Sequence, residues 1–552
     1  MFHSIASSLL RITHITCLAG FLISCHILWG QSSPDNVNVL LIMIDDLNDC
    51  LEGWGGHTQA LTPNIHRLAQ SSASFRQAYT NAPMCGPSRA SLFTGVYPHH
   101  SGNFFQAPWY KKETLSNTRT MMEQFKLHGY HVMGSGKILH HNQNHLWSHF
   151  EHPADYSPSP FDGEERLPHP DVPSPFYEIG WVDGSLGPFI NLEGRKSPEG
   201  KALSWTTGNP NTRFTPMRYV SDDDRDPTPD ERNATWAAET ISDMAQNPLN
   251  QAFFLAVGFL RPHTPLVAPQ KYFDLFPLDE LKVAVNKPGD EEDTHLTVAY
   301  QGDVFTLRMG KKMFHDISEA YGSVELGIKK WTQAYLACVA AVDDNVGEVM
   351  KALDASPFAA NTIVVLASDH GFHMGEKDYL YKNSLWEEST RIPLIMRVPG
   401  LTKAGSNIQQ VVSLIDVYPT LLDLCGLPSE TPKNEKGHSL DGSSLRPLLE
   451  KPQKKKHHFG TPAALTVVYG GSATKDDPRL QHYAIRSNRY RYILYSNGKE
   501  ELYDHQSDPY EWTNLALKPN KKSRRQVKKM RLTLKKMLAP HVLSAWEQVQ
   551  PL

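Results

Sequence analysis

The sequence is poor in cysteine and has no excess of basic residues. Only six cysteines occur in 552 residues, and two of them, Cys17 and Cys25, lie near the start. The remaining four are too few for a disulfide framework in a chain of this size. The formal net charge is −4 at pH 7. Because nucleic-acid-binding proteins usually carry a strong basic excess, we expect no nucleic acid partner.

The sequence also lacks an apolar run of the length that crosses a membrane. A mostly apolar run at 15–29 is interrupted by polar residues at 24–26. This length is typical of a signal-peptide core, so residues 1–30 are predicted to be an export leader, with an anchor helix as the alternative. The mature protein is therefore expected in the periplasm, at the cell surface or secreted. Residues 22–25 also resemble a lipoprotein cleavage box, which would place a lipid anchor on Cys25.

Apolar residues make up 40% of the chain, enough for a large core, and their pattern changes near residue 450. From 36 to 450, short apolar runs alternate with helical patterns, which indicates an α/β domain whose large, mostly parallel sheet is flanked by helices. Residues 451–552 favour a smaller C-terminal α+β domain with an antiparallel sheet. The clearest expected strands are 39–44, 253–257, 363–366 and 393–398, and the clearest expected helices are 63–71, 118–128 and 331–355.

Two segments fit this pattern less well. Residues 153–230 are rich in proline and aspartate and have little periodicity, so we expect long surface loops that wall a binding cleft. Near the C-terminus, a basic helix carries Val527, Met530, Leu534 and Met537 on one face. Its lysines could meet an anionic polymer, although the pattern favours a solvated helix face.

Polar residues directly follow four of the expected strands. Asp45 and Asp46 end the first strand, and Asp369 and His370 follow the strand at 363–366. Because ligands bind beyond the carboxyl ends of parallel strands, these side chains are expected to share one cleft. A further strand expected at 131–133 leads into Lys137 and His140, and the strand that begins at 253 leads into Arg261 and His263.

Asp45, Asp46, Asp369 and His370 form a candidate metal site. Buried carboxylates without a neutralising cation would take up protons. A ligand set dominated by carboxylates suits a hard divalent cation, so Ca²⁺ is expected first and Mg²⁺ second, whereas zinc usually has more nitrogen or sulfur ligands. Taken singly, each pair of residues is also compatible with an ordinary turn or loop.

Cys85 stands directly before Gly-Pro-Ser-Arg89 and a short helical pattern. A helix N-terminus lowers the pKa of a thiol, so a reactive thiolate is one interpretation. The stretch 85–95, CGPSRASLFTG, however, resembles the signature of the type I sulfatases, with Phe93 where leucine is commoner. In that family a formylglycine-generating or anaerobic sulfatase-maturating enzyme converts the cysteine to formylglycine. The resemblance implies that residue 85 is the nucleophile, as a hydrated aldehyde, and also a metal ligand.

The resemblance covers nearly the whole chain after the leader and is greatest to the iduronate-2-sulfatase branch. His370 stands where most sulfatases have asparagine, Lys137 and His140 are one residue further apart than is common, and 261–265 resembles that branch's K/R-P-H-x-P. The implied fold is alkaline-phosphatase-like. The implied activity is hydrolysis of sulfate esters in a sulfated, uronate-containing polysaccharide or its oligosaccharides, by an exo-acting 2-O-sulfatase.

The resemblance also implies roles for single residues. Lys137 and Lys382 would bind the sulfate oxygens, while Arg89 would hold the hydrated aldehyde. His263 or Lys382 would protonate the leaving alcohol. His140 would then remove a proton from the second hydroxyl of the formylglycine, which expels sulfate and regenerates the aldehyde.

Other interpretations stay open. A phosphonate or phosphate ester hydrolase of the same superfamily would use the same nucleophile, and a non-catalytic glycan-binding homologue would keep Cys85 as a thiol. Arg261 would either orient its neighbour or bind a carboxylate of the substrate. Four basic or aromatic residues are expected to contact sugar in the cleft: Lys112, Trp181, Trp205 and Arg213.

Overall fold

The computed structural model describes residues 37–208, 214–295, 305–452, 463–471 and 476–538, together with residues 540 and 542. The expected leader lies outside the described residues. Within the described part of the chain, no helix is both long enough and apolar enough to cross a membrane. The described residues from Asn38 onward form one compact unit, and the boundary expected near residue 450 stays a prediction.

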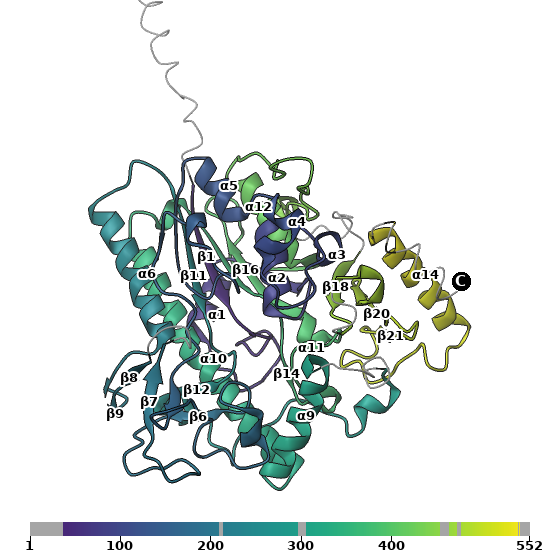
Figure 1. Ribbon diagram of the computed structural model, residues 1–552. Helices are drawn as coiled ribbons and strands as arrows, with labels where there is room; N and C mark the ends of the chain where they lie inside the picture. The colour runs from purple at the N-terminus through teal and green to yellow at the C-terminus, as the bar shows by residue number, and fades with distance from the viewer. Residues whose placement is uncertain are drawn as a thin grey trace, which may run out of the picture. The chain divides into compact units, whose positions relative to one another are not determined.

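A sheet of eight strands carries the expected strands (Figure 1). Its four adjacent central strands run parallel: β13 (Thr362–Ser368), β1 (Asn38–Ile44), β11 (Phe253–Phe259) and β3 (His131–Gly136). The outer strands are β4 (His149–Phe150) beyond β3 and, beyond β13, β16 (Arg391–Arg397), β2 (Ala73–Tyr79) and β17 (Ser406–Ser413). The mostly parallel sheet is confirmed, but β16 runs antiparallel to both of its neighbours.

Helices bury one face of the central strands in a large hydrophobic cluster. Leu40, Ile42 and Ile44 of β1 alternate onto this face and pack with residues of α10 (Val324–Ala355) and α6 (Pro229–Gln246). The expected helices are confirmed as α1 (Pro63–Gln70), α5 (Met121–Leu127) and α10, which begins earlier than its pattern predicted. Further helices include α2 (Cys85–Thr94), α9 (Phe305–Ala320) and α12 (Val417–Leu424).

The segment 153–230 is more ordered than its composition predicts. Its short strands are β5 (Ser159–Phe161), β6 (Leu186–Phe189), β7 (Ser204–Thr207), β8 (Thr215–Met217), β9 (Tyr219–Ser221) and β10 (Asp224–Arg225). Trp205 is buried against Phe189, and its indole N–H donates to the carbonyl of Ile190 at 2.6 Å. The expectation that Trp205 contacts sugar was therefore wrong, because this tryptophan fills a small hydrophobic cluster of its own.

The expected antiparallel sheet is present in the C-terminal region. Its strands are β18 (Ala464–Val468), β19 (His482–Arg486), β20 (Tyr490–Leu494) and β21 (Glu500–Asp504). The basic helix α14 (Lys521–Met537) buries Val527, Met530 and Leu534 in a cluster with residues of this sheet, as Figure 1 shows for α14 beside β20 and β21.

Buried ion pairs tie this sheet to the rest of the molecule, and they lead to a stability prediction. Arg491 of β20 is fully buried and pairs with Glu511 at 2.5 Å and with Glu387. Replacing Arg491 by leucine leaves two buried carboxylates without this cation, so we expect a loss of about 3–5 kcal/mol in the free energy of unfolding. Thermal melting followed by circular dichroism measures the effect. Arg479→Leu, which breaks an exposed pair with Asp477, is the control and should change the melting temperature little.

Candidate active site

The carboxyl ends of the central parallel strands bring the predicted site residues together. In the register of β1 and β13, Ile44 lies opposite Ser368, so the two Asp-containing pairs leave the sheet at the same edge. Helix α2 begins at Cys85 and places its Sγ 3.3 Å from Nε2 of His370. One potential ligand atom from each of Asp45, Asp46, Cys85 and His370 lies within 4.8 Å of the others, and all four residues are buried.

The turn after β1 is held from two other elements. Asp46 has a φ of 61°, in the left-handed region that aspartate tolerates better than most residues. The Tyr335 hydroxyl of α10 donates to the carbonyl of Asp46 at 2.8 Å and accepts from the N–H of Asn48 at 3.0 Å. The hydroxyl of Ser368 accepts from the N–H of Leu47 at 3.0 Å. These contacts fix the direction in which both carboxylates point.

Three basic side chains balance much of the negative charge at the site. Arg89 pairs with Asp369 at 2.8 Å and with Asp45 at 3.2 Å. Lys137 also pairs with Asp45, and Lys382 lies 2.8 and 2.9 Å from the two oxygens of Asp46. All six charged groups are buried. The expectation that a metal must neutralise these carboxylates was therefore incomplete, since it left out the cations that the fold brings to them.

The raised pKa of Asp46 and the donor types fit a divalent cation. Burial, together with Asp45 and Asp369, raises the pKa of Asp46 to about 8 despite Lys382, so further positive charge would stabilise this carboxylate. Nδ1 of His370 lies 3.0 Å from the carbonyl of Gly371, which assigns it as the donor and leaves the Nε2 lone pair facing Asp46. Carboxylate oxygens with one imidazole nitrogen suit a hard cation. Asp369 is not one of the four residues whose ligand atoms cluster within 4.8 Å, but its Oδ2 lies 3.7 Å from Nε2 of His370.

Cys85 lies between two ammonium groups. Its Sγ is 3.4 Å from Nζ of Lys382 and 3.8 Å from Nζ of Lys137. Burial, and then the Asp45 carboxylate, raise the pKa of the thiol above its usual value despite the helix N-terminus. The thiolate interpretation is therefore disfavoured, while an anion next to residue 85 would meet both lysines.

Arg89 contacts carboxylates and carbonyls rather than residue 85. Besides Asp45 and Asp369, its guanidinium donates to the carbonyls of Lys137 and Ile138. The neighbouring Ser88 hydroxyl donates to the carbonyl of Asp369 at 2.6 Å. In this structure Arg89 therefore fixes two potential ligands and the turn after β3, a different contact from the expected one to the hydrated aldehyde.

Both predicted histidines border the site. Nε2 of His263 lies 4.0 Å from Asp46, and its Nδ1 lies 2.5 Å from the carbonyl of Thr264. Nδ1 of His140 is buried and has no hydrogen-bond partner among the described residues. Burial and then the Lys382 ammonium lower the pKa of His263. Burial and then the Lys137 ammonium lower the pKa of His140 to about 3. Both imidazoles are therefore neutral at pH 7.

Tyr156 belongs to the site, although no motif or spacing in the sequence marks it. Its hydroxyl lies 2.9 Å from Nζ of Lys137, whose ammonium also lies 4.8 Å from the centre of the tyrosine ring. The ring edge packs against His263 at 5.2 Å. Arg261 holds the Tyr156 loop by donating to the carbonyl of Ser157 at 3.1 Å. Of the two roles open for Arg261, these contacts favour the orienting one.

Other residues expected in the cleft have different contacts. Lys112 pairs with Asp476, and the Trp181 ring lies 4.5 Å from the guanidinium of Arg166. Arg213 lies outside the described residues. These contacts do not bring Lys112 or Trp181 to the carboxylates described above.

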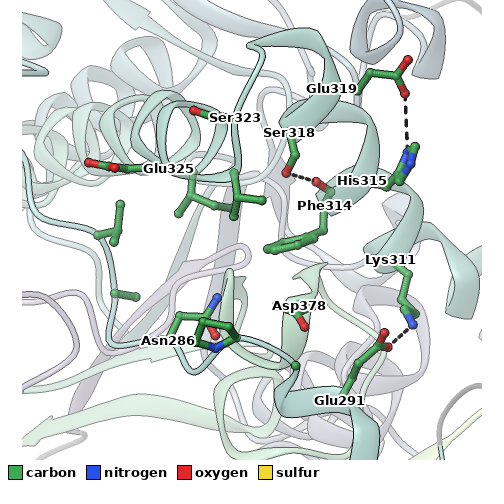
Figure 2. A pocket seen from close by; sticks show the side chains of 16 residues that line it. Asn286, Glu291, Lys311, Phe314, His315, Ser318, Glu319, Ser323, Glu325 and Asp378 are labelled. Atoms are coloured by element: carbon green, nitrogen blue, oxygen red, sulfur yellow. Dashed lines mark hydrogen bonds and ion pairs between the residues drawn. The ribbon is translucent and has the colours of Figure 1, made fainter.

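A separate cavity of about 1120 Å³ lies between α9 and the start of α10 (Figure 2). Phe314 and Ile328 contribute apolar surface to it, and Lys311 of α9 pairs with Glu291 at its side. Figure 2 also shows Asp378 at this cavity. None of the predicted site residues lines it, so this cavity is distinct from the candidate active site.

Two family models match the chain. The model described as Sulfatase matches residues 37–427, and the one described as N-sulphoglucosamine sulphohydrolase, C-terminal, matches residues 375–539. A Formosa agariphila protein named Sulfatase is 35% identical over 495 residues, which cover 88% of this chain and 84% of that protein. Iduronate 2-sulfatase of Mus musculus is 28% identical over 513 residues, which cover 84% of this chain and 86% of that protein.

Solved structures support the expected fold. A phosphonate monoester hydrolase from Silicibacter pomeroyi matches with a TM-score of 0.65 and 19% identity, covering 92% of this chain and 97% of its own. A protein solved with its substrate, D-glucosamine-2-N,6-O-disulfate, matches with a TM-score of 0.63 and 20% identity, covering 91% of this chain and 98% of its own. At these identities the similarity concerns the fold alone. The alkaline-phosphatase-like architecture is thus confirmed.

Proposed function

Since the chain belongs to the sulfatase family and is a sulfuric ester hydrolase, we propose that it removes sulfate from a sulfated, uronate-containing polysaccharide or its oligosaccharides. The observation that carries this proposal is the buried position of Cys85 between Lys137 and Lys382, beside the carboxylates that follow β1. The similarity to an iduronate 2-sulfatase supports a 2-O-sulfate on a uronate as the target. Exo action is part of the same proposal.

Asp45, Asp46, Asp369 and His370, with residue 85, would hold Ca²⁺ or, as second choice, Mg²⁺, which when bound polarises the nucleophile and a sulfate oxygen. Formylglycine formed from Cys85 by a maturating enzyme would supply the nucleophilic hydroxyl. All other steps depend on side chains that the structure shows at the site.

The two lysines bind and stabilise the sulfate group. Both ammonium groups lie within 4 Å of the position of Sγ in Cys85, so they converge on an anion that approaches this residue. Negative charge shifts to the oxygens as the ester bond breaks, and cations in a buried site stabilise that charge without reorganisation. Lys382 carries a proton and is one candidate donor to the leaving alcohol.

The histidines move protons on either side of the reaction. His140 is neutral and its Nδ1 lacks a partner among the described residues, so it can accept the proton of the second formylglycine hydroxyl when sulfate leaves. His263 is the alternative donor to the leaving alcohol. Because it is neutral in the structure, it must first gain a proton, which the negative charge of a bound sulfate ester would favour.

Tyr156→Phe tests the positioning of Lys137. Without the hydroxyl at 2.9 Å, the ammonium is held less firmly toward residue 85, so kcat on a small aryl sulfate should fall about tenfold while the melting temperature stays unchanged. Steady-state kinetics measure kcat and KM separately. Tyr177→Phe in the same segment is the matched control and should leave both constants unchanged. Equal kcat values for Tyr156→Phe and the unaltered enzyme would show that the hydroxyl does not position Lys137.

The sulfated substrate and the leader lead us to propose an exported enzyme. Residues 1–30 would direct export. Removal of the whole leader would leave a mature protein that is soluble in the periplasm or secreted, whereas cleavage directly before Cys25 would leave a lipid on that residue and hold the protein at the cell surface. Fractionation of cells that produce the full chain, with the mass of the mature N-terminus, distinguishes these cases.

Substrate preference tests the proposed function. The maturated enzyme should release sulfate from sulfated uronate oligosaccharides faster than it hydrolyses aryl phosphonates or phosphate esters. Ion chromatography of released sulfate and phosphate measures this ratio directly. A preference for aryl phosphonates would instead assign the enzyme to the phosphonate or phosphate ester hydrolases of the superfamily.

A further inference from the structure

Helix α14 concentrates positive charge in a protein that is acidic elsewhere. Its 17 residues include nine lysines and arginines and no acidic residue. Because the whole chain carries a formal charge of −4 and α14 contributes +9, the rest of the chain carries −13. The helix is therefore a local basic surface rather than part of a generally basic protein.

Several of these charges lie at positions that are unfavourable for the helix itself, although Lys535 and Lys536 in the last turn suit the helix dipole. Four pairs of basic residues are spaced i,i+4, and each like-charge pair costs about 0.2–0.5 kcal/mol in an isolated helix. The first turn contains no acidic residue although the helix dipole favours negative charge there. These charges lower the stability of the helix, and residues that lower stability in this way are expected at functional sites. A ligand of opposite charge would account for them.

The charges face away from the core that α14 packs against. Val527, Met530 and Leu534 are buried on the sheet side, whereas Arg525, Lys528 and the neighbouring basic side chains are exposed. Seven of these basic residues have no ion pair within 4 Å in the described part of the chain: Lys521, Lys522, Arg524, Arg525, Lys528, Lys529 and Lys536. Their charges are available to a partner.

A groove of about 410 Å³ runs along the same helix. Arg524, Lys528 and Arg531 line one side, and Pro519 and Leu532 contribute apolar surface. Arg531 is held by Glu500, with which it pairs through two nitrogens, so this part of the groove is fixed. The basic surface therefore includes a concave site, lined in part by Arg524, Lys528 and Arg531.

We propose that the exposed face of α14, with this groove, is a secondary binding surface for the sulfated polysaccharide chain. The inference rests on the proposed function and adds a second point of attachment to the same polymer. Attachment at α14 raises the effective concentration of sulfate esters at the active site, so it lowers KM for polymeric substrates and leaves short ones unaffected.

The surface fits a sulfated glycan better than two other polyanions. Lipid-binding helices expose an apolar face for insertion, but the apolar face of α14 is packed on the sheet, and Leu532 is its one strongly exposed large hydrophobic residue. Single-stranded nucleic acids bind through aromatic side chains that stack on bases, and neither α14 nor the residues lining the groove include an aromatic residue. A chain of sulfates needs only the cations.

The test compares binding of heparin, used as the sulfated polysaccharide, to the full-length protein and to a triple variant. Arg525→Gln, Lys528→Gln and Lys529→Gln remove three exposed charges without touching the active site. Each basic residue near an anionic surface contributes about fivefold in affinity at low ionic strength, so the triple variant should bind heparin roughly 100-fold more weakly. Its affinity should also depend less steeply on salt, because fewer counterions are released.

A matched variant separates the surface from net charge. Lys282→Gln, Lys351→Gln and Lys403→Gln remove the same charge from exposed positions elsewhere, and this variant should bind heparin as the unaltered protein does. Both variants should hydrolyse a small aryl sulfate at the unaltered rate. Circular dichroism of the α14 variant should show an unchanged or higher melting temperature, since like-charge repulsion is removed.

Several results would overturn the inference. These are equal heparin binding by the α14 variant and the unaltered protein, equal losses in both variants, or α14-dependent binding to phosphatidylserine vesicles or a DNA oligonucleotide without binding to heparin. Failure of the proposed function has a different signature, because the unaltered, maturated enzyme would then release no sulfate from any ester, whatever its affinity for heparin.

Discussion

Replacing Cys85 by alanine is expected to lower sulfate release by at least about 10⁴-fold, because loss of a nucleophile leaves only the contribution of binding and charge stabilisation. Cys85 is 1% exposed and its Sγ lies within 4 Å of His370, Lys137 and Lys382, so the substitution removes the group at the centre of the site. The rate is measured with a small aryl sulfate at saturating concentration, on protein produced with a maturating enzyme.

The matched control is Cys425→Ala, which removes a half-buried thiol outside the site. This variant should retain the activity of the unaltered enzyme. Retention of more than about a tenth of the activity in Cys85→Ala would contradict the account, since the lysines and the metal alone cannot replace a covalent nucleophile.

Removal of the proposed divalent cation is expected to lower sulfate release by about 10²–10⁴-fold, and added Ca²⁺ should restore it. The effect is large because Lewis-acid stabilisation of the developing charge contributes several kcal/mol. Dialysis against a chelator, metal analysis by mass spectrometry and activity after addition of Ca²⁺ or Mg²⁺ measure the change and identify the preferred ion.

Asp46→Asn tests the same site without a chelator. The amide removes one ligand charge and leaves Lys382 without its carboxylate partner, so both metal content and activity should fall. Asp343→Asn is the control, because Asp343 is a buried carboxylate that accepts from Asn64 and Ile65 rather than facing the site. Full activity and an unchanged metal content in Asp46→Asn would contradict the proposed metal site.

Much of the site follows from the sequence because it depends on strand ends. Parallel neighbours share the edge at which their carboxyl ends leave the sheet, so the residues after β1 and β13 had to meet. The position of Cys85 follows from the contiguous pattern at 85–95, which α2 carries into the structure as one helix. A contiguous pattern of this kind predicts the structure well because all of its residues belong to one helix.

The parts that could not be predicted depend on contacts between distant segments. Tyr156 lies in an aperiodic loop, and only its approach to Lys137 shows that it belongs to the site. The same is true of Tyr335, which the pattern of α10 marks only as a buried helical residue. The direction of β16 depends on its connections rather than on its composition. Trp205 was wrongly predicted to contact sugar because burial in a small local cluster leaves no periodic pattern in the sequence.

The measurement that tests the central claim most directly combines two readings on one sample of the protein, produced in a host with a formylglycine-generating enzyme. The first is the mass of the tryptic peptide 77–89, which contains Cys85, and the second is the sulfate that the same sample releases from sulfated uronate oligosaccharides. The account predicts an aldehyde at position 85 together with sulfate release. An aldehyde without sulfate release, or sulfate release by protein whose Cys85 is entirely an unmodified thiol, would contradict it.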